Sequence, residues 1–289
     1  MGSRRKSRGR GSIALALLLG VVALAGPLAG GVEHVAADSL DELHLRVYES
    51  GEWWDVTISP LMVAGITEEQ RAAALQSFAS AIPNAVPGDD GGASAAFVLS
   101  GPRWANGSAT WHYNPSGKPP ELTGDSAALD RAAGAWKQLG GTSFAFVRGA
   151  DTSAGTEACG STRDGQNTVG WAPLPDATLA VTCSWNRSGN PRPEFVEFDM
   201  RIDPEWDWTT GDHPIMDLQS VTTHEFGHAL GLSHTQETLC PGMVMCAVYD
   251  QGAVVRVPAS DDISAMALLY RESTRGPYRV IVSGATRNK

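Results

Sequence analysis

Residues 224–234 read HEFGHALGLSH, and this stretch is the main basis for predicting the fold and the chemistry of the chain. His224 and His228 are four residues apart, so on a helix they lie on one face and can bind one metal ion together. Gly231 permits the left-handed backbone that ends a helix, and His234 then arrives from another direction as a third ligand. Three histidines leave one position of a tetrahedral zinc ion open, which is typical of catalytic rather than structural zinc sites.

Glu225 follows the first histidine directly. Zinc lowers the pKa of a bound water towards about 7 and polarises a carbonyl group, and a neighbouring carboxylate can take the proton as general base. We therefore expect a zinc endopeptidase that hydrolyses peptide bonds through a metal-activated water, with Glu225 as the base. The alternative is an ordinary amphipathic helix with buried histidines, which the fixed positions of Gly231 and His234 disfavour.

This stretch resembles the long zinc signature of the metzincin proteases, and its surroundings are similar to the matrixin branch of that family. Residues 243–249, MVMCAVY, resemble the matrixin methionine turn, and Met245 falls on the position of the family's methionine. Tyr249 either lines the pocket beside the zinc or packs in the core. Residues 260–263 and 267–270 are similar to the start and the end of the matrixin C-terminal helix.

The resemblance implies an α+β fold of the metzincin type, with a twisted, mostly parallel five-stranded sheet, three helices and the methionine turn. The residue pattern predicts a helix over 126–139 and a second one that begins near Asp217, whose carboxylate can cap it. Strands are expected near residues 109–113, 143–147, 168–171, 178–184 and 194–202.

Leu179, Ala180, Val181 and Thr182 look like the family's edge strand above the zinc. An edge strand has unpaired backbone groups, so an extended protein or peptide substrate can dock there by strand addition. The alternative is a strand that the chain's own residues cover.

The chain also departs from the family. His213 is the one histidine between the first helix and the zinc helix, so a second, structural zinc is not expected. Residues 173–177 replace the family's glycine-rich calcium loop. Asp199 is the remaining candidate for binding calcium, and a solvated or turn-capping carboxylate is the alternative.

The first 37 residues predict export. Five basic residues precede the apolar run 13–25, which is the charge order of a secretory signal peptide, with cleavage after Ala25 or Ala37. An uncleaved signal that anchors the protein in a membrane is the alternative. The chain has a formal net charge of −10, and residues 1–37 hold five cationic and one anionic residue, so cleavage after Ala37 leaves −14. Such an acidic chain has no electrostatic reason to bind nucleic acid, and we expect a secreted monomer.

Residues 38–100 differ in kind from the predicted catalytic domain over 101–272, which a tail over 273–289 follows. An alternating piece over 43–58 and a helical stretch over 67–81 precede a linker over 83–94. This segment is either a propeptide or a permanent extension. The first cysteine of the chain is Cys159, so the thiolate switch by which many matrixins cap their zinc cannot exist here.

Cys159, Cys183, Cys240 and Cys246 allow three disulfide pairings in an oxidising compartment. We prefer Cys159 with Cys183 and Cys240 with Cys246, because the second bond would clip the loop that carries Met245. From another functional class, a non-catalytic secreted binding protein that retains zinc for structure is also considered. Glu225 disfavours it, because a structural site needs no base.

Overall fold

The computed structural model describes residues 42–82, 85–87, 102–160, 162–190, 193–211, 215–235, 240 and 242–270. The predicted signal peptide, the C-terminal tail, His213 and most of the predicted linker lie outside these residues. The helices are α1 (Glu68–Ala81), α2 (Asp125–Gly134), α3 (Leu218–Leu230) and α4 (Ser260–Tyr270). The strands of the main sheet are β1 (Leu43–Glu49), β2 (Glu52–Val63), β3 (Val86–Pro87), β4 (Ser108–Tyr113), β5 (Ala145–Arg148), β6 (Thr168–Trp171), β7 (Thr178–Arg187), β8 (Phe195–Ile202) and β11 (Val248–Tyr249). Two short 3₁₀ helices, η1 (Leu139–Gly141) and η2 (Glu157–Cys159), and a separate strand pair, β9 (Trp208–Thr209) and β10 (Met216–Asp217), complete the described elements.

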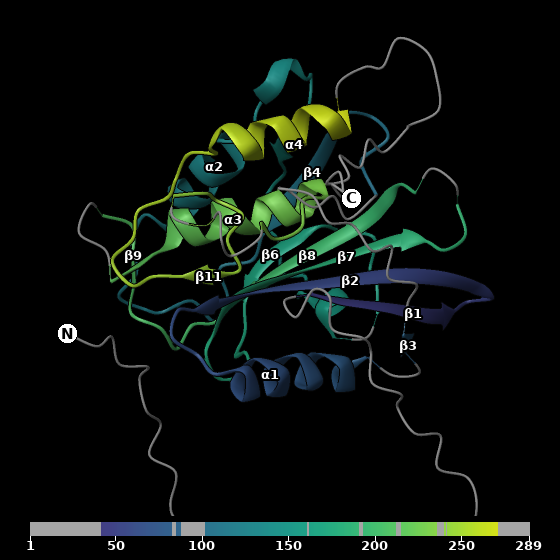
Figure 1. Ribbon diagram of the computed structural model, residues 1–289, viewed down its shortest axis with the longest axis horizontal. Helices are drawn as coiled ribbons and strands as arrows, with labels where there is room; N and C mark the ends of the chain where they lie inside the picture. Colours follow the sequence, from purple (N-terminus) through teal and green to yellow (C-terminus); the bar gives the residue numbers. More distant parts are fainter. Residues whose placement is uncertain are drawn as a thin grey trace, which may run out of the picture.

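The nine-stranded sheet divides the molecule into two layers of helices. Its order is β3-β1-β2-β7-β8-β6-β4-β5, and β11 pairs with β2 as well. Helices α2, α3 and α4 lie on one face of the sheet, whereas α1 lies on the other (Figure 1). The predicted metal-binding motif on α3 therefore lies against the middle of the sheet.

The expectation of a mostly parallel five-stranded sheet with three helices is met only in part: β4 to β8 and α2 to α4 match it after residue 100, whereas the whole sheet has nine strands with both parallel and antiparallel pairs, and the described α-helices number four. Strands β5, β4, β6 and β8 do pair in parallel, and β7 is antiparallel to β8. The residues before 100 add β1, β2 and β3, which pair antiparallel, and they also supply α1 as a fourth helix. The sequence pattern marked these residues as a separate segment, but they extend the same sheet.

The alternating piece over residues 43–58 is a hairpin rather than one strand. Ser50 and Gly51 join β1 to β2 with φ values of 54° and 89°. A two-residue turn with positive φ at both positions matches the right-handed twist of the strands that it connects. Helix α1 follows where the pattern predicts it, and Thr67 and Gln70 form a reciprocal capping box at its start.

Helix α2 ends at Gly134, before its predicted end at residue 139. The chain then turns through Gln138, which has a φ of 56°, into the short helix η1. Trp136 lies within this turn, yet it remains fully buried and its indole N–H donates to the Thr223 carbonyl of α3 at 2.8 Å. The spacing of apolar residues thus identified the core residues correctly but overestimated the length of the helix.

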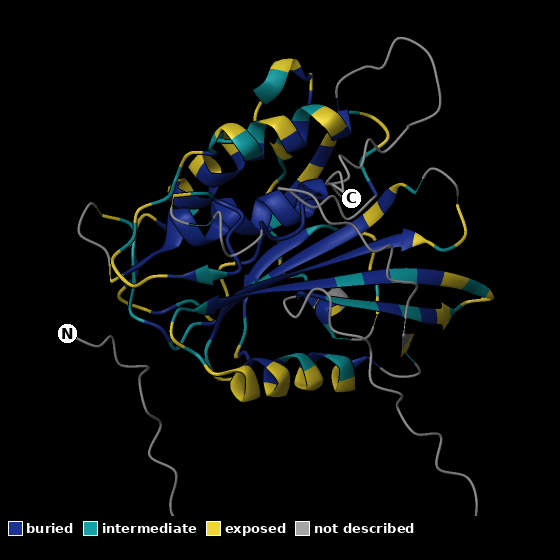
Figure 2. Cartoon of the chain, in the orientation of Figure 1, coloured by how far each residue is buried: buried dark blue, intermediate teal, exposed yellow. Residues whose placement is uncertain are grey.

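Two apolar cores lie on opposite faces of the sheet. The larger core joins α2, α3 and α4 to the sheet and includes Leu61 of β2. The smaller core joins the hairpin and α1 to β7, through residues such as Val56, Phe78 and Trp185. Figure 2 shows that α3 is buried all round, whereas α1 exposes its outer face. The motif on α3 is therefore surrounded by packed residues on every side.

Both disulfides form in the preferred pairing, Cys159 with Cys183 and Cys240 with Cys246. The first links η2 to β7, and the second closes the chain around the methionine turn. Among the described helices, none combines the length and the apolar character that crossing a bilayer requires.

Candidate metal centre

Helix α3 starts and stops where the motif requires. Asp217 caps the first turn, because its carboxylate accepts a hydrogen bond from the Ser220 amide at 3.0 Å. At the other end Gly231 adopts a φ of 103°, in the left-handed region that a residue with a side chain rarely enters. The chain can therefore leave the helix and return His234 to the face that carries His224 and His228.

The three histidines converge on one point. The Nε2 atom of His228 lies 2.8 Å from that of His224 and 3.1 Å from that of His234, and the third Nε2 pair is 3.3 Å apart. All three side chains are buried. Within the part of the chain that the structure describes, this is the one group of three or more potential ligands close enough to hold a metal ion.

The hydrogen bonds around the histidines fix which nitrogen faces inward. His224 Nδ1 lies 2.7 Å from the Val244 carbonyl, and His228 Nδ1 lies 2.7 Å from the Leu232 carbonyl. A carbonyl only accepts, so each Nδ1 carries the proton and each Nε2 presents a lone pair. Burial lowers the pKa of all three imidazoles, that of His224 to about 4, so they stay neutral. Lone pairs this close repel each other unless a cation lies between them, so the donor set fits zinc.

Glu225 lies beside the triad and is held from the sheet. Thr182 Oγ1 on β7 donates to Glu225 Oε2 at 2.6 Å, whereas Oε1 has no hydrogen-bond partner among the described residues. Burial raises the pKa of Glu225 well above its ordinary value; the bond from Thr182 opposes this rise, and the charge of Glu42 adds to it. A buried carboxylate with one oxygen fixed and one available is suited to accept a proton.

Met245 packs under α3 as the resemblance implies. A Cβ atom built on Gly227 would lie 2.2 Å from Met245 Sδ and 2.9 Å from Trp136. Glycine at this position of the helix thus allows the methionine turn to approach the helix closely. On the other side of the turn, the Asp262 carboxylate of α4 accepts from the Val244 amide at 3.1 Å, and Val244 in turn binds His224.

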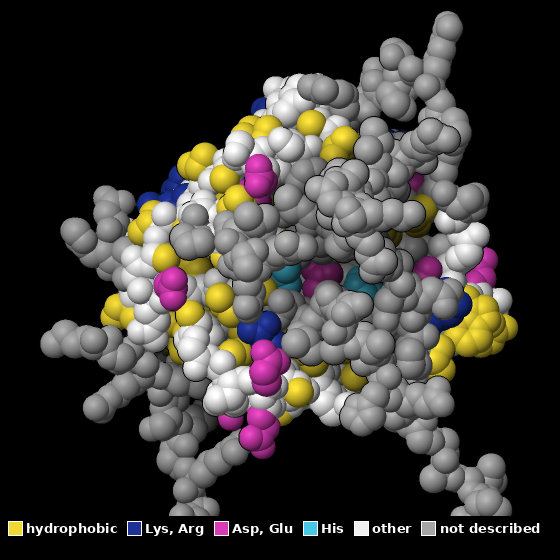
Figure 3. All heavy atoms as spheres, in the orientation of Figure 1, with side chains coloured by type: hydrophobic (Ala, Val, Ile, Leu, Met, Phe, Trp, Pro, Cys, Tyr) yellow, Lys and Arg dark blue, Asp and Glu magenta, His cyan; other side chains and the backbone are white. Residues whose placement is uncertain are grey.

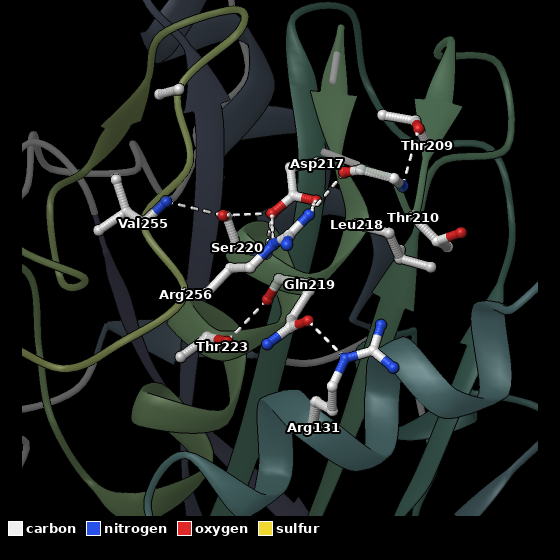
Figure 4. Close-up of polar contacts among 12 residues, drawn as sticks. Arg131, Thr209, Thr210, Asp217, Leu218, Gln219, Ser220, Thr223, Val255 and Arg256 are labelled. Carbon is white, nitrogen blue, oxygen red and sulfur yellow. Dashed lines mark hydrogen bonds and ion pairs between the residues drawn. The ribbon is translucent and has the colours of Figure 1, made fainter. Parts of the chain in front are cut away.

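A polar network holds the first turn of α3. The Asp217 carboxylate accepts hydrogen bonds from Arg256 Nε at 2.8 Å and from Arg256 Nη2 at 2.7 Å (Figure 4). It also accepts the hydrogen bond from the Ser220 amide. Ser220 Oγ also accepts from the Val255 amide at 2.8 Å, so the segment after the methionine turn is bound to the zinc helix. In the same turn, the Gln219 side chain accepts a hydrogen bond from Arg131 Nε of α2 at 2.8 Å (Figure 4).

The expectation that Leu179, Ala180, Val181 and Thr182 form a free edge is wrong. Strand β7 pairs with β8 on one side and with β2 on the other, and β2 covers it from Thr178 to Arg187. The alternative of a strand covered by the chain's own residues is therefore the one observed. Of these four residues, Thr182 is the one whose side chain forms a described hydrogen bond with a site residue, Glu225.

Tyr249 lies in the larger core and is buried. Its hydroxyl donates to the Ala253 carbonyl and accepts from the Asp217 amide at 3.4 Å, and burial raises its pKa to about 12. These contacts are those of a packing tyrosine, and a role in lining a pocket stays a prediction. Calcium binding also stays a prediction: Asp199 is buried on β8, where one carboxylate oxygen accepts from the Thr168 amide at 2.8 Å.

Sequence reasoning missed Glu42, which is buried next to the motif. Its carboxylate accepts hydrogen bonds from the side chains of Ser59 and Ser233 and from the His234 amide, and it lies 3.5 Å from His228 Nδ1. No local pattern marks this residue, because its partners are far away in the sequence. Gly227 was also missed, although a glycine inside a helix is a signal of close packing.

A hollow opens near the middle of the face that Figure 3 shows, and histidine and acidic side chains are visible at its floor. Three histidines with an adjacent carboxylate, over a methionine-containing turn, define the catalytic part of a metzincin. Comparison with known families agrees: the matrixin family model matches residues 188–271. The chain carries a matrixin-like catalytic domain.

The chain is also similar to parts of several curated proteins. Matrix metalloproteinase-25 of Mus musculus is 38% identical over 89 residues, which cover 28% of this chain and 14% of that protein. Stromelysin-3 of Homo sapiens is 51% identical over 77 residues, 26% of this chain and 14% of that protein. Matrilysin of Mus musculus is 36% identical over 73 residues, 25% of this chain and 26% of that protein. These matches span a small part of each relative, so they identify the domain and not the biological role.

Proposed function

We propose that this chain is a zinc-dependent endopeptidase, exported from the cell and acting on proteins or peptides. One observation supports it above all others. Three neutral imidazoles converge beside a buried carboxylate that has one oxygen without a partner among the described residues. His224, His228 and His234 would hold one zinc ion, which would supply Lewis acidity and increase the acidity of water.

The chain's own residues supply the proton transfers. Glu225 takes a proton through Oε1 from the attacking water, and it later returns that proton to the amine of the departing peptide. Thr182 holds the other oxygen at 2.6 Å, so the carboxylate keeps one orientation. The hydrogen bonds of His224 and His228 to backbone carbonyls keep their Nε2 atoms free of protons.

The substrate would bind in extended form along residues 179–182. Backbone groups of a strand give affinity without requiring one sequence, which suits an endopeptidase. In the described structure β2 takes that position, so docking requires that β2 leave β7.

Export is proposed from the first 37 residues and from the two disulfides, because disulfides persist in oxidising compartments. N-terminal sequencing of protein recovered from the medium would test it. An N-terminus at Gly26 or Asp38 supports cleavage, whereas protein retained in the membrane with residue 1 intact would contradict it.

The covered strand favours a second candidate, a non-catalytic zinc-containing protein. The two functions differ in one experiment: digestion of a peptide library by the chain from Asp38, with and without a chelator, followed by mass spectrometry. A Glu225→Ala chain is the matched control. Cleavage that the chelator and the substitution both abolish supports the peptidase. A chain that holds zinc but cleaves nothing, even after β2 is displaced, supports the non-catalytic protein.

A further inference from the structure

Strand β2 lies between two segments that flank the metal centre. On one side Ser59, Pro60 and Leu61 pair antiparallel with Thr182, Val181 and Ala180 of β7. On the other side Met62 and Val63 pair in parallel with β11, directly after the methionine turn. Backbone bonds close both sides: the Met62 amide donates to the Ala247 carbonyl at 3.3 Å, and the Val63 amide donates to the Ala177 carbonyl at 3.0 Å.

The side chains of β2 show which face approaches the metal centre. Residues opposite each other in an antiparallel pair point to the same face of the sheet. Thr182 points to Glu225, so its partner Ser59 and the next residue on that face, Leu61, also lie on the α3 side. Leu61 is buried in the core that contains α3, whereas Ile58 belongs to the core on the opposite face.

The same segment binds the zinc motif through Glu42. Ser59 Oγ donates to Glu42 Oε1 at 3.1 Å, and Glu42 accepts from Ser233 and from the His234 amide. The N-terminal segment thus touches the strand that would receive a substrate, the segment after the methionine turn and the third histidine.

We propose that residues 59–63 are an intramolecular ligand of the peptide-docking track between β7 and β11, so that the segment from Glu42 to Ala81 keeps the metal centre closed. This inference rests on the proposed function. An extended peptide that docks on β7 by strand addition needs the backbone groups that β2 already uses. Substrate and β2 therefore exclude each other.

A cut between β3 and β4 does not open the site. The hairpin and α1 are bound to the rest of the molecule by the pairing of β2 with β7 along its length and by the smaller core, in which Phe78 and Ile82 of the α1 region share one cluster with Cys183 and Trp185. The cleaved segment stays bound without a covalent link. Release requires that β2 itself be displaced or cut.

The test measures access to the track independently of catalysis. The probe is a fluorescein-labelled peptide with the sequence of residues 57–65, and its binding to the chain from Asp38 in a Glu225→Ala background is measured by anisotropy. Leu61→Asp places a carboxylate in the apolar core and should weaken the closed state. We expect peptide binding to strengthen by about tenfold or more, because a ligand binds in proportion to the fraction of open molecules.

Leu61→Ala and Leu129→Ala form a matched pair that guards against simple misfolding. Both remove the same atoms from fully buried positions of the same core, but Leu129 lies on α2, away from the track. We expect increased binding for Leu61→Ala and no increase for Leu129→Ala, with one zinc per chain in both. Equal increases would mean that general loosening opens the site, and would overturn the proposal.

A recognition sequence for a specific protease, inserted within residues 88–101, tests the remaining claim. After the cut, the two fragments should elute together in size-exclusion chromatography, and the probe should bind no better than before. Fragments that separate at once and bind the probe, or an uncut chain that binds it as well as Leu61→Asp, would overturn the proposal. In the Glu225-containing chains, tight probe binding by Leu61→Asp without any hydrolysis would contradict the peptidase function while leaving the closed track in place.

Discussion

At the scale of single residues, the metal centre depends on three imidazoles whose lone pairs face each other. Each Nε2 lies within 3.3 Å of the other two, and the hydrogen bonds at Nδ1 of His224 and His228 orient the rings before any metal binds. Because the rings are preoriented, each ligand should contribute strongly to affinity.

The three Nε2 atoms form a nearly equilateral triangle, so each histidine should be needed for the metal to bind. We expect His228→Ala to lose most of the zinc that the wild-type chain carries at about one ion per chain, since two imidazoles cannot hold the ion tightly. Metal analysis of dialysed protein measures this loss. Full zinc retention in the variant would show that His228 is not a ligand.

Substitution of Glu225 distinguishes catalysis from metal binding, because Glu225 is proposed as the base and not as a zinc ligand. In a chain whose track is open, Glu225→Ala should keep its zinc and lower turnover by about 100-fold or more, the scale of a positioned acid–base group. Glu225→Gln, which keeps the size and a hydrogen-bonding oxygen for Thr182, is the control for shape. Unchanged turnover in either variant would mean that another residue is the base.

Substitutions of Gly227 and Gly134 by alanine test whether the methionine turn packs closely against α3. A Cβ on Gly227 would collide with Met245 and Trp136, whereas nothing lies within 4 Å of a Cβ on Gly134. We expect Gly227→Ala to destabilise the protein by about 1–3 kcal/mol through overpacking. Gly134→Ala should instead stabilise it by up to about 1 kcal/mol through helix propensity. Urea unfolding compares the two, and a Gly227→Ala chain as stable as the wild type would contradict the packing argument.

At the scale of elements, α3 is positioned by bonds at both ends. Its first turn depends on Asp217, which is completely buried and bound by Arg256 and Ser220. The segment after the methionine turn is attached to the same serine through the Val255 amide. The helix and the segment after the methionine turn are therefore joined through one carboxylate and one serine.

Arg256→Ala should destabilise the protein by about 3 kcal/mol, because it leaves a buried carboxylate without its cation. Arg187→Ala is the control. Its ion pair with Glu52 is exposed, with side-chain exposures of 59% and 44%, so we expect a loss of about 0–1 kcal/mol. Thermal or urea unfolding of both variants measures the difference. Equal losses would show that the Asp217 network does not hold the helix.

The sequence was most informative where structure is local. The spacing of the histidines, the cap at Asp217 and the glycine at 231 all act within a few residues, so they predicted α3 and its ends correctly. Strand pairing is not local: Ser59 and Thr182 are partners although more than a hundred residues separate them. Pro60 is also atypical of a central strand, since proline cannot donate to a ladder. The structure accommodates Pro60 because β1 pairs with β2 only as far as Ile58 and β11 begins at Met62.

At the scale of the whole molecule, the N-terminal segment and the matrixin-like domain share one sheet and two cores. An N-terminal extension that is joined to the domain only by a linker could be removed by one cut. A segment that supplies central strands cannot be removed in this way, because its removal exposes β7 and the remaining residues of the smaller core. The pairing of β2 with β7 therefore belongs to the folded state, and opening the proposed track would require strand exchange.

The central claim is that one zinc ion, held by the three histidines, makes this chain a peptidase. The most direct measurement uses the Leu61→Asp chain, removes its metal with a chelator and titrates zinc back while hydrolysis of library peptides is followed. We predict that activity is lost on removal and returns in proportion to zinc, with a plateau at about one ion per chain. Activity that persists without metal, or a chain that is refilled with zinc and remains inactive, would contradict the account.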